Sequence, residues 1–285
     1  MGYARSQQNT IFHAVVAKDG TGDYTTVQSA IDAVPENLKS PWLIFVKNGS
    51  YEEQVIIPQN KPFIHLIGQD KERTIIHLKL NVGGKPDANT KDLAYWHYSV
   101  HNPKSAVSHF EGAVVNINAS DFYSENISYV NDWGLEAQNG PQALALKTKA
   151  DRIAFYNCKF RSFQDTWMTT TRDADRHYVK ECWLEGAVDY FYGGGNALVE
   201  KSILYNVRSG SVIVAPCHES VKYGYVFRNC VIDGNEQAAD GKLKLGRPWH
   251  NSPKAVYINT LVKIPLAPEG WTNMGTIPAL FAEYN

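Results

Sequence analysis

Short apolar runs recur along this chain, and each is bounded by turn-forming residues. The runs LIFV at 43–46, VII at 55–57 and HLIG at 65–68 end in Gly, Asn, Pro or a charged residue, and many of their neighbours alternate between apolar and polar. Period-two alternation and runs of about four residues are typical of short β-strands. The pattern therefore predicts a succession of strands and tight turns.

Residues 27–34 depart from that pattern. Val27, Ala30, Ile31 and Val34 follow helical spacing, and Pro35 comes directly after them. This spacing predicts a short helix that ends before the proline. We expect the helix to close the N-terminal end of a repeating structure, because terminal repeats need a cap.

A repeat is visible where a small residue follows a polar one after an apolar run. Cys158, Cys182, Ser202 and Cys230 occupy equivalent places in successive units of similar length. Each unit has room for two or three strands and must stack on its neighbours to bury its apolar faces, as in a parallel β-helix. We predict an all-β solenoid and a single domain over residues 1–285.

Two segments interrupt the repeat. Residues 79–112 are rich in aromatics and are longer than a simple connecting loop needs to be, which predicts a functional loop. The alternative is an insertion without a function. From about residue 263 the chain no longer repeats, and we expect this tail to pack along the outside of the solenoid.

Three polar residues recur at nearly the same interval. The separation between Gln142 and Asp165 is almost equal to that between Asp165 and Asp189. Stacked coils lie about 4.8 Å apart, so residues one period apart become neighbours on one outer face. An amide and two carboxylates gathered in this way form a candidate site.

The motifs around these residues resemble those of the pectin methylesterases. They are QALAL at 142–146, QDTWM at 164–168, VDYFYG at 188–193 and LGRPW at 245–249, with further agreement in GTGDYTTVQSAIDAVP, NGSYEE and the final EYN. The resemblance runs in order over nearly the whole chain. It implies a right-handed parallel β-helix with long loops around a cleft, and hydrolysis of the C6 methyl esters of homogalacturonan.

Ester hydrolysis needs a nucleophile, a proton donor for the leaving alkoxide and a donor to the oxyanion. Two neighbouring carboxylates titrate as a coupled pair, and a guanidinium bound to one of them keeps it ionised. The resemblance assigns these roles: Asp189 as nucleophile, Asp165 as general acid and base, Gln142 and Gln164 at the oxyanion, and Arg247 orienting Asp189. The expected substrate-binding residues are Trp249, Tyr192, Val188, Trp271 and Met274, the first two as flat surfaces for sugar rings.

The chain also departs from the family pattern. Trp167 stands where the family usually has Leu, and YFY at 190–192 replaces FIF. We expect these side chains to make the cleft more polar and narrower, and Gly193–Gly195 to form a bare loop beside it.

Composition narrows the partners. A formal net charge of −1 gives no general attraction to nucleic acid. No apolar run approaches the length that a membrane-spanning helix needs. The N-terminal residues do not resemble a secretory leader, which leaves a cytosolic protein or a mature form; the resemblance favours a mature secreted or periplasmic monomer. The four cysteines form no CxxC pair, and we expect neither metal nor cofactor.

Several alternatives remain open at this point. Cys158 and Cys182 are either buried thiols or a disulfide; in the bacterial enzymes that the chain resembles, the bridge joins the next coil, where Ser202 stands here. The competing functions are a lyase that cleaves by β-elimination, a glycan-binding solenoid without activity, and an esterase or thioesterase of the same fold. A serine esterase is unsupported, because no GxSxG motif occurs.

Overall fold

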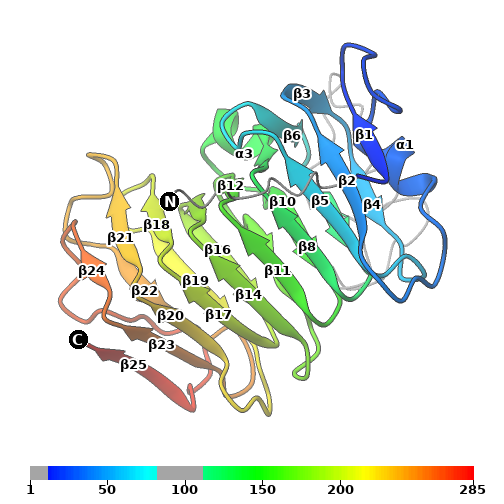
Figure 1. The fold of residues 1–285 in the computed structure, drawn as a ribbon. Coiled ribbons are helices and arrows are strands. Elements are labelled where there is room, and N and C mark those ends of the chain that lie inside the picture. The colour runs from blue at the N-terminus through cyan, green and yellow to red at the C-terminus, as the bar shows by residue number, and fades with distance from the viewer. Residues whose placement is uncertain (1–11, 82–111) are drawn as a thin grey trace, which may run out of the picture.

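The structure, a computed structural model, describes residues 12–81 and 112–285. Within these residues the strands form three sheets that wrap around a common core (Figure 1). Neighbouring strands pair in parallel register, for example β11 with β14 and β16 with β19. The prediction of an all-β, right-handed parallel β-helix is confirmed.

Each coil of the solenoid passes through the three sheets in turn. The ten-stranded sheet contains β1 (Ala14–Val16), β2 (Trp42–Val46), β5 (Ile64–Gly68), β8 (Phe122–Glu125), β11 (Ile153–Tyr156), β14 (Arg176–Lys180), β17 (Asn196–Glu200), β20 (Tyr225–Arg228), β23 (Lys254–Ile258) and β25 (Leu280–Tyr284). The eight-stranded sheet contains β3 (Gly49–Glu52), β6 (Thr74–Leu78), β9 (Ser128–Asn131), β12 (Lys159–Arg161), β15 (Trp183–Gly186), β18 (Ile203–Asn206), β21 (Val231–Gly234) and β24 (Leu261–Val262). The seven-stranded sheet contains β4 (Val55–Ile57), β7 (Ala113–Ile117), β10 (Leu144–Thr148), β13 (Trp167–Met168), β16 (Val188–Gly193), β19 (Val212–Pro216) and β22 (Lys244–Gly246).

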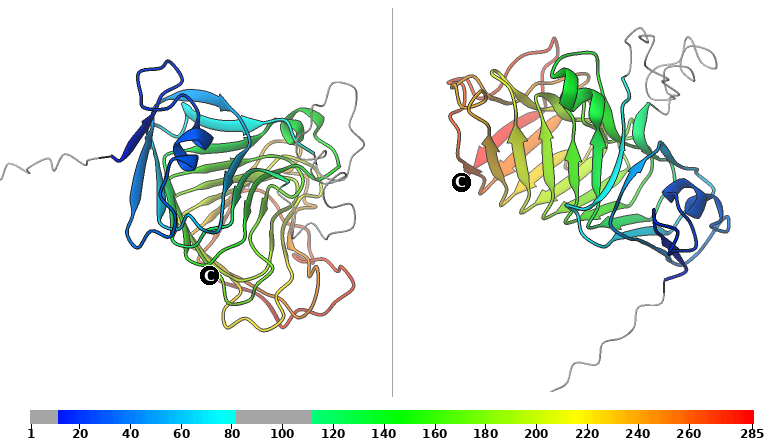
Figure 2. Two further views of the ribbon diagram at one scale, coloured as in Figure 1. Left: turned by 90° about the vertical axis from the view of Figure 1, so that its right-hand side faces the viewer. Right: turned by 90° about the horizontal axis from the view of Figure 1, so that it is seen from above.

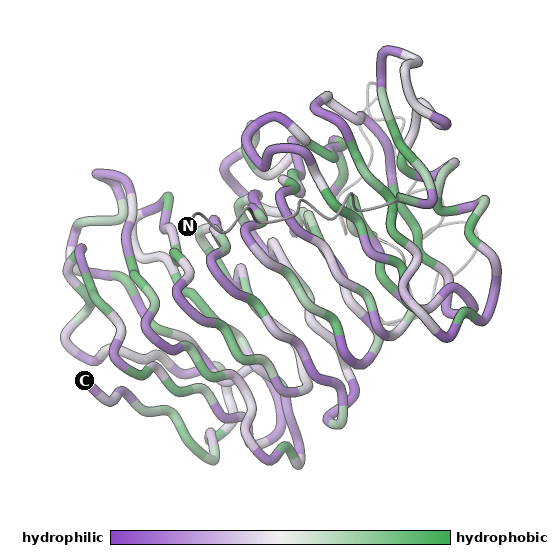
Figure 3. Tube along the Cα trace, in the orientation of Figure 1, coloured by the Kyte–Doolittle hydropathy of each residue, from purple (hydrophilic) through white to green (hydrophobic). Residues whose placement is uncertain are grey.

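The core consists of side chains that stack from coil to coil. Figure 3 shows the hydrophobic residues concentrated along the strands and the hydrophilic ones at many of the turns. Trp167 is fully buried, with its ring 5.1 Å from those of Phe155 and Phe191, and its Nε1 donates to Thr148 Oγ1 at 3.1 Å. The expectation that Trp167 narrows the cleft is therefore wrong, because this residue faces inward. Tyr190 and Phe191 are buried as well.

The corner between the ten-stranded and eight-stranded sheets explains the repeat in the sequence. Six of these corners have one residue with positive φ, followed by a buried residue that is small at every corner from β11 onward; the positive-φ residues are Asn126, Asn157, Glu181, Lys201, Asn229 and Asn259. Cys158, Cys182 and Cys230 occupy the inward places and are buried free thiols. The Cys158 backbone N–H donates to Cys182 Sγ at 3.3 Å, and the Cys182 N–H donates to Ser202 Oγ at 3.1 Å.

The predicted helix is α1 (Val27–Asp32), which lies at the N-terminal end of the solenoid (Figure 2). Its Val27, Ala30 and Ile31 are buried against the first coils. The Glu53 carboxylate accepts hydrogen bonds from the N–H groups of Val27 and Gln28 at 2.8 and 2.9 Å. An anionic group at these free N–H groups stabilises the start of a helix.

A second helix, α3 (Asp132–Ala137), was not predicted. The Asn131 side chain caps it by accepting from the Trp133 N–H at 3.1 Å, and Gln138 ends it in the left-handed conformation. This helix fills the connection between β9 and β10, immediately before Gln142. The expected long loop of residues 79–112 falls, apart from its ends, outside the described residues.

The tail does not stay wholly outside the sheets. Residues 280–284 form β25, which pairs with β23 from Lys254↔Leu280 to Ile258↔Tyr284. The expectation of an external tail is therefore wrong for these residues, since their backbone continues the ladder of the ten-stranded sheet. Residues 263–279 connect β24 to this strand.

Candidate active site

Asp165 and Asp189 lie on successive coils. Asp165 is in the turn between β12 and β13, and Asp189 is the second residue of β16. Gln164 bridges to Val188, and the Asp165 N–H donates to the Val188 carbonyl at 2.9 Å, so the two aspartates are in register. Both have positive φ, 61° and 50°, which is uncommon outside glycine. Such strained positions concentrate at functional sites.

A β-bulge determines how Asp189 is presented. The pairing of β16 with β19 shifts between Val188 and Phe191, so Asp189 and Tyr190 interrupt the regular ladder. A bulge of this kind redirects the side chains next to it. Because of the bulge, the Phe191 side chain points into the core while Asp189 stays opposite Asp165 on the neighbouring coil.

Arg247 holds the Asp189 carboxylate with two parallel hydrogen bonds. Nε donates to Oδ1 at 2.9 Å and Nη2 donates to Oδ2 at 2.6 Å. Arg247 follows β22, two coils beyond β16, and Gly246 before it has no room for a side chain: a Cβ there would lie 2.4 Å from Val214 Cγ2. The close approach of β22 to β19 thus brings Arg247 within reach of Asp189.

The two carboxyl groups have different electrostatic surroundings. Burial raises the pKa of Asp165 well above its usual value, and the neighbouring Asp189 charge raises it further. Burial also raises the pKa of Asp189, but the hydrogen bonds and charge of Arg247 oppose that rise. The difference favours the ionised form at Asp189 and the protonated form at Asp165.

Tyr192 supports the site from beneath. It is 4% exposed, and its hydroxyl interacts with the Asp165 carboxyl as a hydrogen-bond donor. The Trp249 ring packs edge-on to it, with centroids 5.6 Å apart, and Trp249 itself is partly exposed. The expectation that Tyr192 offers a flat face to a sugar is wrong, because that face is covered. Trp249 remains as an accessible ring.

The two glutamines are on adjacent coils. The Ala143 N–H donates to the Gln164 carbonyl at 3.1 Å. Gln164 Oε1 lies 3.3 Å from where a Cβ on Gly140 would stand, so its amide reaches the turn that precedes Gln142. Both residues are partly exposed. The structure thus brings Gln142 and Gln164 together, beside Asp165.

Val188 belongs to a small apolar cluster next to the nucleophile position. It packs with Phe163, Ala187 and Val207. Arg208, which the sequence reasoning missed, lies with its guanidinium 5.8 Å from the Phe163 ring and lowers the pKa of Asp189 through its charge. The sequence spacing from Cys182 to Ser202, applied to Val188, would have placed Arg208 one coil later.

The other two predicted contact residues lie in the final loop. Trp271 bridges to Gly246 and stacks on Phe281 with ring centroids 4.4 Å apart, so it adjoins the segment that carries Arg247. Met274 follows shortly after in the chain and is exposed. The role of Met274 as a contact residue stays a prediction.

The glycines at the end of β16 and directly after it are not a bare loop in a cleft. Gly193–Gly195 are buried, and a Cβ at Gly193 would lie 2.8 Å from Thr169 Oγ1 and 2.9 Å from the Thr170 carbonyl. That expectation is wrong because neighbouring coils approach each other too closely here for side chains. Within residues 12–81 and 112–285, no three His, Cys, Asp or Glu side chains gather as a metal site.

The sequence and fold match proteins of known family. A family model described as Pectinesterase matches residues 13–95 and 97–284. The chain is 33% identical to Pectinesterase 31 of Arabidopsis thaliana over 94% of this chain and 80% of that protein, and 30% identical to Pectinesterase of Petunia integrifolia over 95% and 70%.

Solved structures agree with these relatives. Pectin methylesterase from carrot superposes with a TM-score of 0.79 and 25% identity, covering 97% of this chain and 83% of that one. The enzyme from Aspergillus niger gives a TM-score of 0.77 and 26% identity, over 95% and 83%. The chain therefore belongs to the pectinesterase family of carboxylic ester hydrolases.

Proposed function

We propose that this protein removes the C6 methyl esters of homogalacturonan, releasing methanol and leaving free galacturonate, through a covalent acyl-enzyme on Asp189. The observation that carries the proposal is the two-point hold of Arg247 on Asp189 beside a second carboxyl group whose pKa is raised. In this arrangement an ionised nucleophile and a protonated acid lie opposite each other on successive coils.

In the first step an Asp189 oxygen attacks the ester carbonyl carbon. The amides of Gln142 and Gln164 donate to the oxygen that becomes negative, and Asp165 gives its proton to the departing methoxide. Methanol leaves and an anhydride joins Asp189 to the galacturonosyl unit. Asp165, now ionised, then takes a proton from water, whose oxygen attacks the galacturonosyl carbonyl. Cleavage of the anhydride frees the galacturonate and the Asp189 carboxylate.

Tyr192 and Arg208 support this chemistry from outside the pair. The Tyr192 hydroxyl donates to Asp165 and holds that carboxyl in place. Arg208 adds positive charge near Asp189 at the surface where an acidic polymer would lie. Trp249 offers a partly exposed ring to the sugar, and Val188, Trp271 and Met274 complete the proposed contacts.

The proposed substrate is methyl-esterified homogalacturonan or its oligosaccharides, acted on by a monomer outside the cell or in the periplasm. A related pectin methylesterase structure holds a hexasaccharide. The described part of the chain has no helix that meets the length and hydropathy needed to cross a membrane. A lyase function is less well supported, because Arg247 is engaged by Asp189 and is not a free base.

Methanol release from highly methylated pectin is the direct test. Wild-type protein is expected to release methanol with no gain in absorbance from unsaturated uronates, whereas a lyase gives the opposite result. Asp189→Asn should lower turnover by several orders of magnitude with an unchanged melting profile. More than about a tenth of wild-type activity in that variant would contradict the assignment of the nucleophile.

A further inference from the structure

The two residues that follow Gln142 are held by buried polar side chains from other parts of the chain. The Ala143 carbonyl accepts a hydrogen bond from Ser162 Oγ at 2.5 Å, and the Leu144 carbonyl accepts one from Asn131 Nδ2 at 3.0 Å. Ser162 and Asn131 are both 0% exposed. No step of the proposed reaction uses either side chain.

Asn131, the last residue of β9, joins three segments through one carboxamide. Its Oδ1 accepts from the Trp133 N–H at 3.1 Å, at the start of α3, and from the Leu80 N–H at 3.3 Å, while its Nδ2 reaches β10 at Leu144. The hydrogen bonds to Leu80 and Leu144 are buried, so removal of the side chain leaves backbone groups unpaired away from water. The carboxamide therefore fixes the start of β10 relative to β9 and α3.

Ser162 ties the same segment to the next coil, two residues before Gln164. Helix α3 packs directly on it: a Cβ at Gly134 would overlap Ser162 Oγ and would lie 2.7 Å from the Phe163 nitrogen. The Ala143 N–H donates to the Gln164 carbonyl at 3.1 Å. Ala143 thus has both its N–H and its carbonyl bonded to the coil that carries Gln164.

These contacts bear on the direction of the Gln142 amide. Gln142 is partly exposed, so the place of its amide depends on the backbone from which the side chain leaves. An oxyanion donor is effective when it is held in place before the charge develops. A displacement of about 1 Å costs roughly 10²-fold in rate.

We propose that Asn131 and Ser162 are positioning residues for Gln142. By holding the carbonyls of the two residues that follow Gln142, they aim its amide at the oxyanion. The inference rests on the proposed function. In this role Asn131 and Ser162 act through Gln142 and not through contact with the substrate.

A double-mutant cycle on methanol release tests the inference. Gln142→Ala should lower kcat about 10²-fold, and Asn131→Ala and Ser162→Ala should each lower kcat about tenfold with KM unchanged. In a Gln142→Ala background, either change should lower kcat by no more than about twofold further, because the amide that it positions is gone. Losses that multiply, or a raised KM with kcat unchanged, would overturn the inference.

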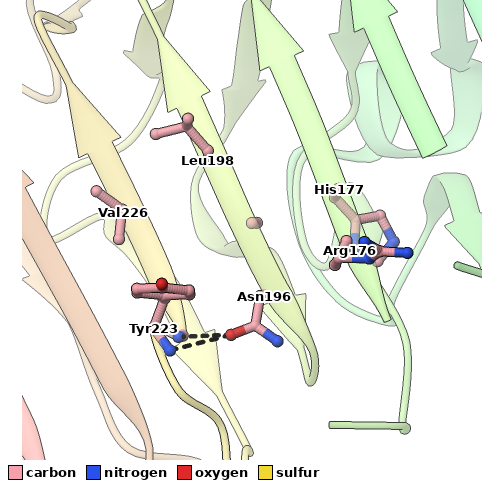
Figure 4. A pocket seen from close by; sticks show the side chains of 8 residues that line it. Arg176, His177, Asn196, Leu198, Tyr223 and Val226 are labelled. Atoms are coloured by element: carbon pink, nitrogen blue, oxygen red, sulfur yellow. Dashed lines mark hydrogen bonds between the residues drawn. The ribbon is translucent and has the colours of Figure 1, made fainter. Parts of the chain in front are cut away.

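Asn196 provides a matched control on another sheet. Its Oδ1 accepts from the N–H groups of Tyr223 and Gly224 at 3.1 and 3.2 Å (Figure 4), and its Nδ2 donates to the Asp173 carbonyl at 2.9 Å. This carboxamide also joins three segments, but it borders a pocket of about 350 Å³ on the ten-stranded sheet and not the seven-stranded sheet of β10. Asn196→Ala should lower the melting temperature and leave kcat unchanged. An equal loss of kcat in Asn196→Ala and Asn131→Ala would assign the effect to stability and overturn the inference.

The choice of ester separates Gln142 from Asp165. A methyl ester and an activated aryl ester of the same oligogalacturonide pass through the same oxyanion, so Ser162→Ala should slow both to the same degree. A loss confined to the methyl ester would assign the effect to the proton donor, Asp165, and contradict the inference. Absence of methanol release from wild type would overturn the proposed function and this inference with it. Multiplied losses in an active enzyme would overturn the inference alone.

Discussion

Arg247 offers the sharpest test of how the two carboxyl groups divide their work. Arg247→Ala removes two charge-assisted hydrogen bonds from a carboxylate that is only 6% exposed. Hydrogen bonds to charged groups are worth about 1.5–3 kcal/mol each, so the loss of two corresponds to a rise of roughly 2–4 pKa units for Asp189. Because Asp189 attacks in its ionised form, activity falls as pH drops through its pKa. The acid limb of the pH–rate profile should therefore move by that amount to higher pH.

Arg247→Lys separates charge from geometry. Lysine keeps a positive charge but loses the planar two-point contact, so Asp189 stays ionised and is badly aimed. A misplacement of about 1 Å costs roughly 10²-fold in rate, and we expect that loss with little movement of the acid limb.

The assay is methanol release from one methylated oligogalacturonide over a range of pH. Arg228→Ala is the matched control, because Arg228 makes a similar two-nitrogen contact to Glu200 on the ten-stranded sheet. Its profile should coincide with that of wild type. A fixed acid limb in Arg247→Ala, with only KM raised, would show that Arg247 binds substrate carboxylates and is not the partner of the nucleophile.

Three further predictions concern buried groups. Asp165→Asn should slow hydrolysis of the methyl ester far more than hydrolysis of an activated aryl ester. Because the pKa of Asp165 is raised in the folded protein, the wild type loses stability as pH rises above 3.8, so the variant should melt at a higher temperature than wild type at neutral pH. A lower melting temperature of the variant at that pH would contradict this reasoning. The pKa of buried His177 falls from 6.5 to about 4, so roughly 3 kcal/mol of stability should be lost as pH drops from 6.5 to 4, and His177→Gln should flatten that slope in denaturant titrations. Gly193→Ala should lower the free energy of unfolding by more than about 2 kcal/mol, because the new Cβ would press against Thr169. Gly210→Ala, where no atom lies within 4 Å of the new Cβ, should lower it by only about 1 kcal/mol. Equal losses in the two variants would mean that the close approach at Gly193 does not affect stability.

The repeat made the solenoid predictable from sequence. From β11 to β24, the corners between the ten-stranded and eight-stranded sheets combine a positive-φ residue with a small buried residue, and the spacing of Cys158, Cys182 and Ser202 reports the length of each coil. Because the coils pair in parallel register, residues that are one coil length apart in the sequence lie next to each other on adjacent coils. For this reason the sequence alone could place Asp165 and Asp189 side by side.

The direction of side chains was less predictable, because it depends on the pairing register of neighbouring strands and, in β16, on a bulge. A shift of one residue changes which members of an alternating segment face the core. Trp167 and Tyr192 were both expected at the cleft, yet Trp167 faces inward, and Tyr192 is covered by Trp249 from two coils further on. The pattern of a single strand does not contain that information. Helix α3 was missed for a similar reason: it occupies a corner, where the repeat sets no pattern.

The asymmetry of the catalytic pair arises outside the two coils that carry it. Asp165 and Asp189 have almost the same backbone conformation and lie in register, so neither local sequence nor main chain distinguishes an acid from a nucleophile. Arg247 arrives from two coils beyond Asp189 and donates two hydrogen bonds to that carboxylate. The stacking of coils places two carboxyl groups in equivalent positions, and a residue from a later coil gives them different electrostatic surroundings. A change that preserves both aspartates but moves β22 away from β19 should therefore remove the division of charge, and with it the activity.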